Sequence, residues 1–557
     1  MILTVTTFLG ATLAVALATF LIVKRMKHSS DAIEDFFIGG RSLSWPIVAG
    51  SLLLTNLSTE QLVGLNGAVF KDGNLVGIAW EALAAFAMIA TALLFLPRYL
   101  SSGFTTTPGF LAVRYDESTK KLVSGLFLFG YVTVLLPVVL YTGSLALKTM
   151  FDLDLPLWSI VIGIGTLGSL YAIFGGLRSV AVSDTMNGIG LLIGGLAIPM
   201  MALSSLGDGS IGEGLSILIS DRPESLTPLA MENKSGEAAS VPWTTLLSGM
   251  MFIQIFYWST NQVIVQRAMA AKSLAHGQKG VLFAAAMKLV GPVMLCLPGI
   301  IALHMTDSLN IKADDEVYPA IVRHVLPNWS LGLFGAVLVG SILSSFNSAL
   351  NSASTLFCLD FYVPIVEKGS NTKVEAARCV KVGQIFATCL AVTAMIVAPL
   401  LAQMDSIFAY LQKINGLYSV PIIAIFLVGV LNKTAPAIGA KWAMAVGILL
   451  YGFFTFFGPF DVFCQASDIE LFGLLDLLRP IASIHWLHGY FISTLMAIAV
   501  LLYFAKVAPR VIDDVNSASA PKSAPVSVEP WQFAKPAAVA IVVVTVVMYV
   551  GLLSLSQ

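Results

Sequence analysis

Charged side chains are scarce in this chain. Only 11% of its 557 residues are Asp, Glu, Lys or Arg, whereas 57% are hydrophobic. A soluble globular protein carries about twice that charged fraction, so the composition excludes a string of soluble domains. The net charge of −1 gives no electrostatic basis for binding nucleic acid.

Cysteine is also rare, and the common catalytic and metal-binding motifs are missing. The five cysteines have no paired spacing, so we expect buried thiols rather than a disulfide framework or a metal site. The six histidines form no His-Glu-x-x-His motif. We therefore expect no enzymatic activity, no organic cofactor and no obligate protein partner. The cysteines are Cys296, Cys358, Cys379, Cys389 and Cys464.

Long apolar runs separated by short charged loops fill the chain, a pattern typical of polytopic membrane proteins. We predict an all-α fold with about 14 transmembrane helices. The first run has no basic leader and no small-residue cleavage site, which favours a retained helix over a signal peptide. The predicted spans are 2–23, 45–68, 76–97, 122–149, 157–175, 186–205, 243–260, 280–304, 331–358, 381–402, 405–430, 437–457, 485–505 and 535–555.

Lysine and arginine concentrate in alternate loops, whereas the 206–242 and 305–330 loops are poor in both. Because basic loops stay in the cytoplasm, we predict a protein of the plasma (inner) membrane with both termini extracytoplasmic. An Ala-, Ser- and Pro-rich stretch at about 517–530 is predicted to be a flexible cytoplasmic linker. The basic loops are 24–27, 98–121, 267–279, 368–381 and 433–441.

The second span contains a polar run, Thr55-Asn56-Leu57-Ser58-Thr59-Glu60-Gln61. At 1.5 Å per residue, a helix that begins near Trp45 places this run close to the middle of the bilayer. A local break there would release backbone carbonyls, which suit a small cation. The alternative is that these groups only join helices through hydrogen bonds.

Further polar residues lie at membrane depth, where such groups are functional candidates. Glu81 must be paired, hydrogen-bonded or protonated, unless it is an interfacial anchor. The run Gln254–Gln262 combines amides, hydroxyls and aromatic rings, which suit a sugar. Lys288 would cost about 2.5–3.5 kcal/mol at mid-membrane, although it lies close enough to the inner end to snorkel.

Hydroxyl-bearing residues recur from Ser341 to Thr355. Ser344 and Ser345 offer ligands opposite the Asn56 run, although small residues also allow close helix packing. Gln412 is a weaker candidate. Asp184 follows Gly175-Gly176-Leu177-Arg178 and could simply cap the next helix.

Taken together, these motifs resemble the sodium:solute symporter family over nearly the whole chain, close to its bacterial members that carry galactose or glucose. The resemblance implies a LeuT-like core of two inverted five-helix repeats whose first helices are broken. The motifs that carry it are Phe36–Leu43, Asn56–Gln61, Gly175–Arg178, Tyr257–Gln262, Gln266-Arg267, Ala271–Ser273, Gln278–Gly280 and Leu350–Thr355.

On this resemblance we expect a peripheral first helix and cytoplasmic loop at 1–44, followed by repeats at 45–205 and 243–430. The extracellular loop would be 206–242, and 431–557 would hold peripheral C-terminal helices. The partners would be sodium as the coupling ion, a small-molecule solute and the lipid bilayer.

The resemblance also implies roles for individual residues. Sodium would bind the carbonyls of Leu54, Leu57 and Ser341 and the hydroxyls of Ser344 and Ser345. The solute would bind Asn56, Gln61, Glu81, Gln254, Lys288 and Gln412, with Asn56 linking both sites. Tyr257 would be the inner gate, Leu65, Trp80 and Phe408 the outer gate, and Asp184 would lie on the sodium exit path.

Three positions depart from the sugar-transporting pattern, which has Ser, Asn and Tyr where this chain has Ala84, Gln254 and Trp80. The retained Gln61, Glu81, Lys288 and Gln412 still describe a site for hydroxyl groups, so we expect sodium-coupled import of a polyhydroxylated solute such as galactose or glucose. A sodium symporter of the same fold for an inositol, sialic acid or another organic acid stays the alternative.

Overall fold

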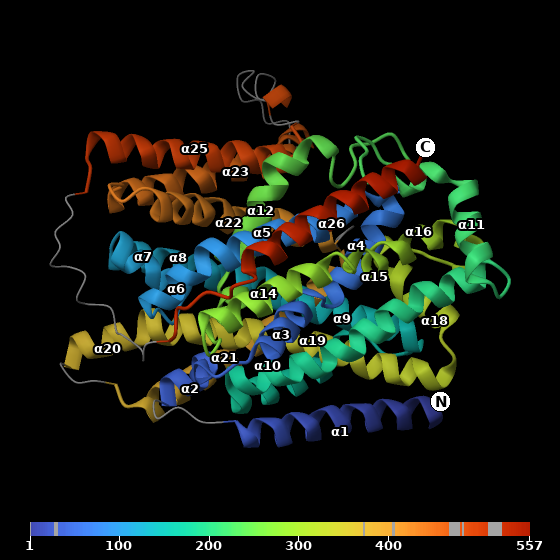
Figure 1. Ribbon diagram of the computed structural model, residues 1–557, viewed down its shortest axis with the longest axis horizontal. Coiled ribbons are helices and arrows are strands. Elements are labelled where there is room, and N and C mark those ends of the chain that lie inside the picture. The colour runs from blue at the N-terminus through green and yellow to red at the C-terminus, as the bar shows by residue number, and fades with distance from the viewer. Residues whose placement is uncertain are drawn as a thin grey trace.

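The computed structural model describes residues 2–26, 32–370, 374–403, 407–466, 479–481, 484–510 and 526–557. Most of the predicted linker, residues 517–525, lies outside these ranges. The described chain is helical, with only isolated β-bridges. Its helices run alongside one another in a bundle, and both termini lie at the same end of it (Figure 1). That placement fits an even number of membrane crossings.

The first half of the chain contributes eleven of the labelled helices. They are α1 (Ile2–Arg25), α2 (Ala32–Ile38), α3 (Trp45–Asn56), α4 (Thr59–Asp72), α5 (Ala79–Ala90), α6 (Leu96–Ser102), α7 (Thr107–Arg114), α8 (Glu117–Gly130), α9 (Leu136–Phe151), α10 (Leu157–Leu206) and α11 (Ile211–Asp221). Short π-helical turns join α5 to α6 at Thr91–Phe95 and α8 to α9 at Tyr131–Leu135.

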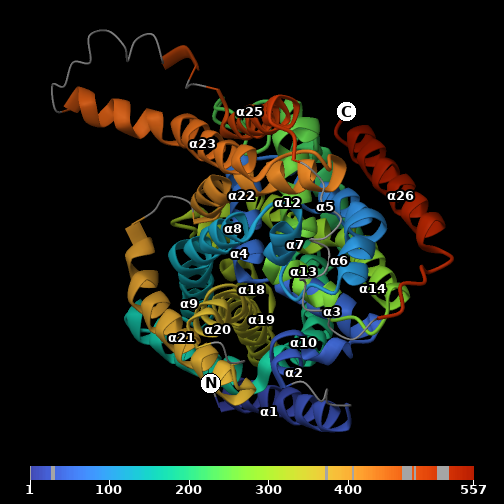
Figure 2. The same ribbon diagram turned by 90° about the vertical axis from the view of Figure 1, so that its left-hand side faces the viewer.

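The second half continues from the 206–242 loop. Its helices are α12 (Met251–Ser259), α13 (Gln262–Met269), α14 (Leu274–Lys288), α15 (Gly291–Leu295), α16 (Leu297–Leu303), α17 (Thr306–Leu309), α18 (Val317–Val325), α19 (Asn328–Leu356), α20 (Val363–Ser370), α21 (Ala376–Val397), α22 (Ile407–Leu431), α23 (Ala437–Ala466), α25 (Trp486–Val507) and α26 (Ala534–Leu555). Seen end-on, α1, α21, α23 and α26 lie at the periphery (Figure 2).

Ten helices among the described residues are long and apolar enough to cross a membrane, or eleven if the pair bent by 49° at α14–α16 counts as one span. The remaining predicted spans are not single straight helices. Span 157–175 runs into the next one as part of α10, which kinks at Gly176, where φ is 59°. Spans 45–68 and 243–260 are interrupted. A multi-pass α-helical membrane fold is thus confirmed.

Both predicted helix breaks are present. α3 ends at Asn56, Leu57 leaves the helical region with ψ of 64°, and Ser58 is extended before α4 begins. α12 ends at Ser259, and α13 begins at Gln262. The residue before it, Asn261, caps α13, because its side chain accepts a hydrogen bond from the Val263 amide at 3.1 Å. This cap satisfies one of the free amides at the new helix start, so the second break is built into the sequence.

Two sequence-based expectations and one alternative are wrong in detail. Asp184 is no helix cap, because it lies inside α10, two turns beyond the Gly176 kink. Arg267 is no loop residue, because α13 turns back into the bundle and buries it completely. Among the cysteines, Cys296, Cys358 and Cys379 are buried but Cys389 is exposed on α21. The Cys464 side chain lies outside the described set.

A short loop element covers the predicted outer end of α4. The 3-10 turn Asp314–Glu316 packs so closely that a Cβ at Gly67 would come within 2.5 Å of the Asp314 carbonyl oxygen. The Asp315 carboxylate is buried and accepts a hydrogen bond from the backbone N–H of Ile407, the first residue of α22. Burial raises the pKa of the Asp315 carboxyl from 3.8 to about 6 despite that bond.

We therefore expect the 305–330 loop to be held more firmly at pH 5 than at pH 7.5. A carboxyl whose pKa is raised in the folded state stabilises that state fully below its ordinary pKa, and the contribution is lost as the pH rises to about 6. Hydrogen exchange corrected for intrinsic rates should show slower exchange in this loop at pH 5. Asp315→Asn should remove most of the difference, and equal protection in the unsubstituted protein at both pH values would contradict the assignment.

Candidate functional site

A buried ion pair lies at the centre of the bundle, beside the break between α3 and α4. The Lys288 ammonium donates hydrogen bonds to both carboxylate oxygens of Glu81, at 2.8 and 2.7 Å. It also donates to the side-chain oxygen of Asn56 and lies 5.3 Å from the Trp258 ring centroid. We call Asn56, Glu81, Trp258 and Lys288 the central cluster. Snorkelling of Lys288 is thereby excluded.

Local helix structure supports the charge of Lys288. Lys288 is the last residue of α14, whereas Glu81 lies further inside its helix, because α5 continues directly from the 3-10 turn Leu75–Ile78. A helix stabilises a cation at its carboxyl end by about 0.3–1 kcal/mol at the surface. A Cβ at Gly291 would collide with a Glu81 carboxylate oxygen, so this glycine lets the next helix approach the pair.

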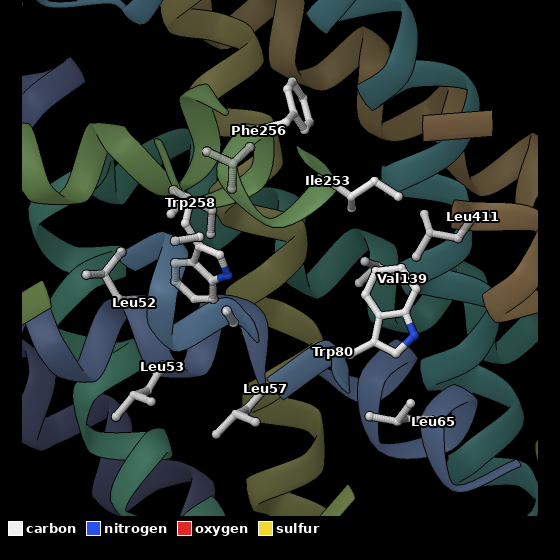
Figure 3. Close-up of a cluster of buried hydrophobic side chains, with 14 of the residues drawn as sticks. Leu52, Leu53, Leu57, Leu65, Trp80, Val139, Ile253, Phe256, Trp258 and Leu411 are labelled. Carbon is white, nitrogen blue, oxygen red and sulfur yellow. The ribbon is translucent and has the colours of Figure 1, made fainter. Parts of the chain in front are cut away.

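Aromatic side chains enclose the central cluster from two directions. Tyr257 lies beside Asn56 and meets Trp258 edge to face, with ring centroids 5.4 Å apart. Trp80 and Phe408 also meet edge to face at 5.4 Å. Trp80 lies between Leu65 and Leu411 (Figure 3). Of the predicted gate residues, Tyr257 thus lies against Asn56 of the cluster, whereas Leu65, Trp80 and Phe408 pack together, with Trp80 directly preceding Glu81 in the chain.

The three predicted glutamine ligands differ in their surroundings. Gln254 donates its amide to the Trp80 carbonyl at 2.7 Å, so that donor is used within the protein. The side-chain oxygen of Gln61 is buried without a hydrogen-bond partner, which leaves an acceptor to satisfy. Gln412 is buried on α22, one turn after Phe408.

Of the predicted sodium ligands, the Leu57 carbonyl and the side chains of Ser341, Ser344 and Ser345 lie where α19 passes the α3–α4 break, with Ser341 placing its hydroxyl there and not the predicted carbonyl. The Ser341 hydroxyl donates to the Leu57 carbonyl at 3.0 Å, and the Ser345 hydroxyl donates to the Thr55 carbonyl at 3.4 Å. The Ser344 hydroxyl is buried beside Asp184 without a well-formed hydrogen bond. The Thr55 carbonyl is a neighbour that the sequence interpretation did not include. These oxygens could coordinate a cation in place of bonding one another.

A second buried ion pair, which the sequence interpretation missed, lies next to these serines. Arg267 is completely buried, and its guanidinium lies 3.7 Å from the Asp184 carboxylate. Ser51 bridges the two, donating to Asp184 at 2.8 Å and accepting from Arg267 at 2.9 Å. Arg267 also donates to Ser348 on α19. The network joins α3, α10, α13 and α19 beside the candidate sodium ligands.

Among the described residues no group of three or more His, Cys, Asp or Glu side chains could hold a metal ion. The candidate cation ligands are instead hydroxyls and carbonyls, which carry no full charge. Such oxygens bind a monovalent ion weakly enough to release it again. The central cluster offers amide, carboxylate and ammonium groups between aromatic rings, a combination suited to binding a hydroxylated ring.

Comparison with known proteins places these features in context. The family model described as "Sodium:solute symporter family" matches residues 36–447. The chain is 38% identical over 554 residues to the "Uncharacterized symporter YidK" of Escherichia coli (strain K12), covering 98% of this chain and 90% of that protein. It is 31% identical over 474 residues to the "Sodium/glucose cotransporter" of Vibrio parahaemolyticus, covering 82% of this chain and 85% of that protein.

A solved structure has the same fold. It is the substrate-bound, outward-open state of a Na+-coupled sialic acid symporter, with a TM-score of 0.74 and 19% sequence identity. The alignment covers 91% of this chain and 98% of that one. At this identity the similarity shows the fold alone.

Proposed function

Because the chain belongs to the sodium:solute symporter family, we propose that it imports a small polyhydroxylated solute together with sodium, the solute being a monosaccharide of the galactose or glucose type. Membership makes the chain a sodium-coupled transporter of the membrane and not an enzyme. The choice of solute is our proposal.

The observation that carries this choice is the Lys288–Glu81 pair. Both carboxylate oxygens accept from the same ammonium, so the pair has no net charge. A hydroxyl both donates and accepts a hydrogen bond, and it can therefore bind either partner without adding charge. An anionic solute would have to displace Glu81 from Lys288 or lie next to an uncompensated carboxylate, which is costly in a buried site.

We assign the residues as follows. Gln61, Glu81, Gln254, Lys288 and Gln412 hold the solute, and Asn56 couples it to the sodium site. Sodium is held by carbonyls of Leu54, Leu57 and Ser341 with the hydroxyls of Ser344 and Ser345, and it leaves past Asp184. Leu65, Trp80 and Phe408 close the outer side, while Tyr257 closes the inner side.

Import then follows alternating access, in which the site opens to one side of the membrane at a time. One sodium ion that moves down a potential of about 100 mV supplies about 2.3 kcal/mol. At about 1.4 kcal/mol per tenfold change, that supports roughly 40- to 50-fold accumulation before the sodium gradient is added.

A second candidate is a symporter of the same fold for an inositol, sialic acid or another organic acid. The observation that favours it is Gln254, whose amide is held by the Trp80 carbonyl. Trp80 and Gln254 both depart from the sugar-transporting pattern, as does Ala84, so this side of the pocket differs in shape. An anionic substrate would use Lys288 as its counter-ion.

Thermal stability measured with a solute panel separates these candidates. The purified protein would be tested with hexoses, myo-inositol and N-acetylneuraminate in sodium chloride and in choline chloride. A ligand at about 100 times its Kd stabilises the folded state by about 2.7 kcal/mol. We expect a rise in Tm with a hexose in sodium only. A rise with myo-inositol or N-acetylneuraminate but with no hexose would favour the second candidate, and a hexose response of equal size in choline would contradict sodium coupling.

A further inference from the structure

Two apolar grooves run along the predicted inner half of the bundle, on either side of a ridge formed by Trp45 and Phe283. The rings of this ridge meet edge to face, with centroids 5.6 Å apart. The first groove, of about 470 Å³, lies between α14 and α26 and reaches Ala286 and Ile541. The second, of about 220 Å³, lies between α3 and α10 and reaches Leu57. Trp45 and Phe283 line both grooves.

The depth of the second groove matches one leaflet of a bilayer. Twelve residues separate Trp45 from Leu57, about 18 Å at 1.5 Å per residue, and half of a hydrocarbon core is about 15 Å. Leu53 and Leu57 point to the same side, away from Trp258 (Figure 3). Figure 2 shows α26 at the edge of the bundle, alongside α14. The second groove is therefore deep enough for an acyl chain of the length that a phospholipid carries.

The predicted cytoplasmic end of the first groove, which we call its mouth, is lined by Trp45, Lys279 and Trp531 and so combines positive charge with tryptophan rings. Lys279 lines the first groove, and its ammonium lies 5.6 Å from the Trp531 ring centroid. None of the described carboxylates forms an ion pair with Lys279. Lys272 and Lys535 are exposed close by in the chain, as is the carboxylate of Glu529. Excess positive charge at this end of the bundle would attract an anionic headgroup.

The chain before α26 is fixed to this mouth. The Ser527 carbonyl accepts a hydrogen bond from the Leu274 amide at 2.9 Å, and the Trp531 amide donates to the Gln278 side chain at 2.8 Å. These bonds set the spacing between α14 and α26 while leaving the space between them apolar. The groove is thus part of the fold and not a gap left by a loosely attached helix.

From these features we propose that the protein binds one anionic phospholipid of the predicted cytoplasmic leaflet at the Trp45–Phe283 ridge. One acyl chain occupies each groove, and the phosphate contacts Lys279. Empty space beside apolar side chains forfeits dispersion contacts, which the chains restore. The chain in the second groove packs against Leu57, whose carbonyl accepts from Ser341, so the lipid touches the back of the candidate sodium site.

Native mass spectrometry of the purified full-length chain tests this. The protein would be delipidated and titrated separately with palmitoyl-oleoyl phosphatidylglycerol and palmitoyl-oleoyl phosphatidylcholine. We expect one tightly retained phosphatidylglycerol, with retention lowered roughly tenfold by Lys279→Glu. Lys506→Glu is the matched control, because Lys506 is an exposed lysine in the last turn of α25, away from both grooves, and it should not change retention.

A second pair of variants tests the grooves themselves. Ala540→Leu and Ala286→Leu fill the first groove without altering charge and should lower retention of both lipids, with an unchanged Tm showing that the fold is intact. Equal retention of the two lipids by the unsubstituted chain would overturn the proposal. Retention of phosphatidylglycerol unaffected by Lys279→Glu, or lost equally in Lys506→Glu, would overturn it as well.

Discussion

Replacing Lys288 with alanine is expected to abolish solute uptake and to destabilise the protein. Both oxygens of the Glu81 carboxylate are bonded to Lys288, so the substitution leaves this carboxylate buried without its ion-pair partner. Breaking a buried ion pair by removing one partner costs about 3–5 kcal/mol. Uptake and Tm measured on the same preparation would show both losses.

A double variant separates folding from solute binding. Lys288→Met combined with Glu81→Gln removes both charges at nearly constant volume, so no uncompensated buried charge remains to destabilise the fold. We expect Tm to recover while uptake stays absent, because the two charged groups that bind the solute hydroxyls are gone. Recovery of uptake in the double variant would contradict the assignment of the pair to the solute site.

A more exposed ion pair supplies the matched control. Lys441 and Asp116 are also 2.7 Å apart, but their side chains are 33% and 37% exposed. Exposed pairs contribute about 0–1 kcal/mol. Lys441→Met should therefore leave both Tm and uptake nearly unchanged. That result would show that burial, and not pairing alone, makes Lys288 essential.

Replacing Ser344 or Ser345 with alanine is expected to raise the sodium concentration needed for half-maximal uptake. Each substitution removes one hydroxyl beside the α3–α4 break while keeping a small side chain. Hydrogen-bond-like contacts to a charged group contribute about 1.5–3 kcal/mol, so each variant should need roughly 10- to 100-fold more sodium. Uptake at saturating sodium should be affected far less than the sodium dependence.

Ser352 provides the control for this pair. It lies on the same helix, and its hydroxyl donates to the Gln266 side chain at 2.7 Å, away from the break. Ser352→Ala should lower stability slightly without changing the sodium dependence. Sodium dependence that stays unchanged in both Ser344→Ala and Ser345→Ala would remove these residues from the site.

Both helix breaks could be predicted because they combine a local signal with a resemblance. Polar residues interrupt an apolar span near mid-membrane at Asn56, and a second polar run ends the 243–260 span at Asn261, where the resemblance places the other break; backbone released there must find partners. Glu81 and Lys288 could each be singled out as costly at that depth. Their pairing could not be predicted, since 207 positions separate them in sequence and only the fold brings them together.

The errors share a physical cause. Arg267 and Asp184 lie near charged loops in the sequence, which suggests a loop position for Arg267 and, as an alternative, a helix cap for Asp184. A broken helix returns its second half to the bundle, so α13 buries Arg267 against Asp184. The length of an apolar run also gives the wrong helix limits where a helix breaks or kinks, as at Leu57 and Gly176. The hydrogen bond that occupies the Gln254 amide has no sequence signal at all.

Counterflow in proteoliposomes tests the central proposal most directly. Vesicles loaded with unlabelled hexose would be diluted into labelled hexose, with sodium or choline at equal concentration on both sides. We predict transient accumulation of label in sodium only, and none with the Lys288→Met, Glu81→Gln double variant. Equal accumulation in choline, or accumulation of a labelled organic acid but of no neutral polyhydroxylated solute, would contradict it.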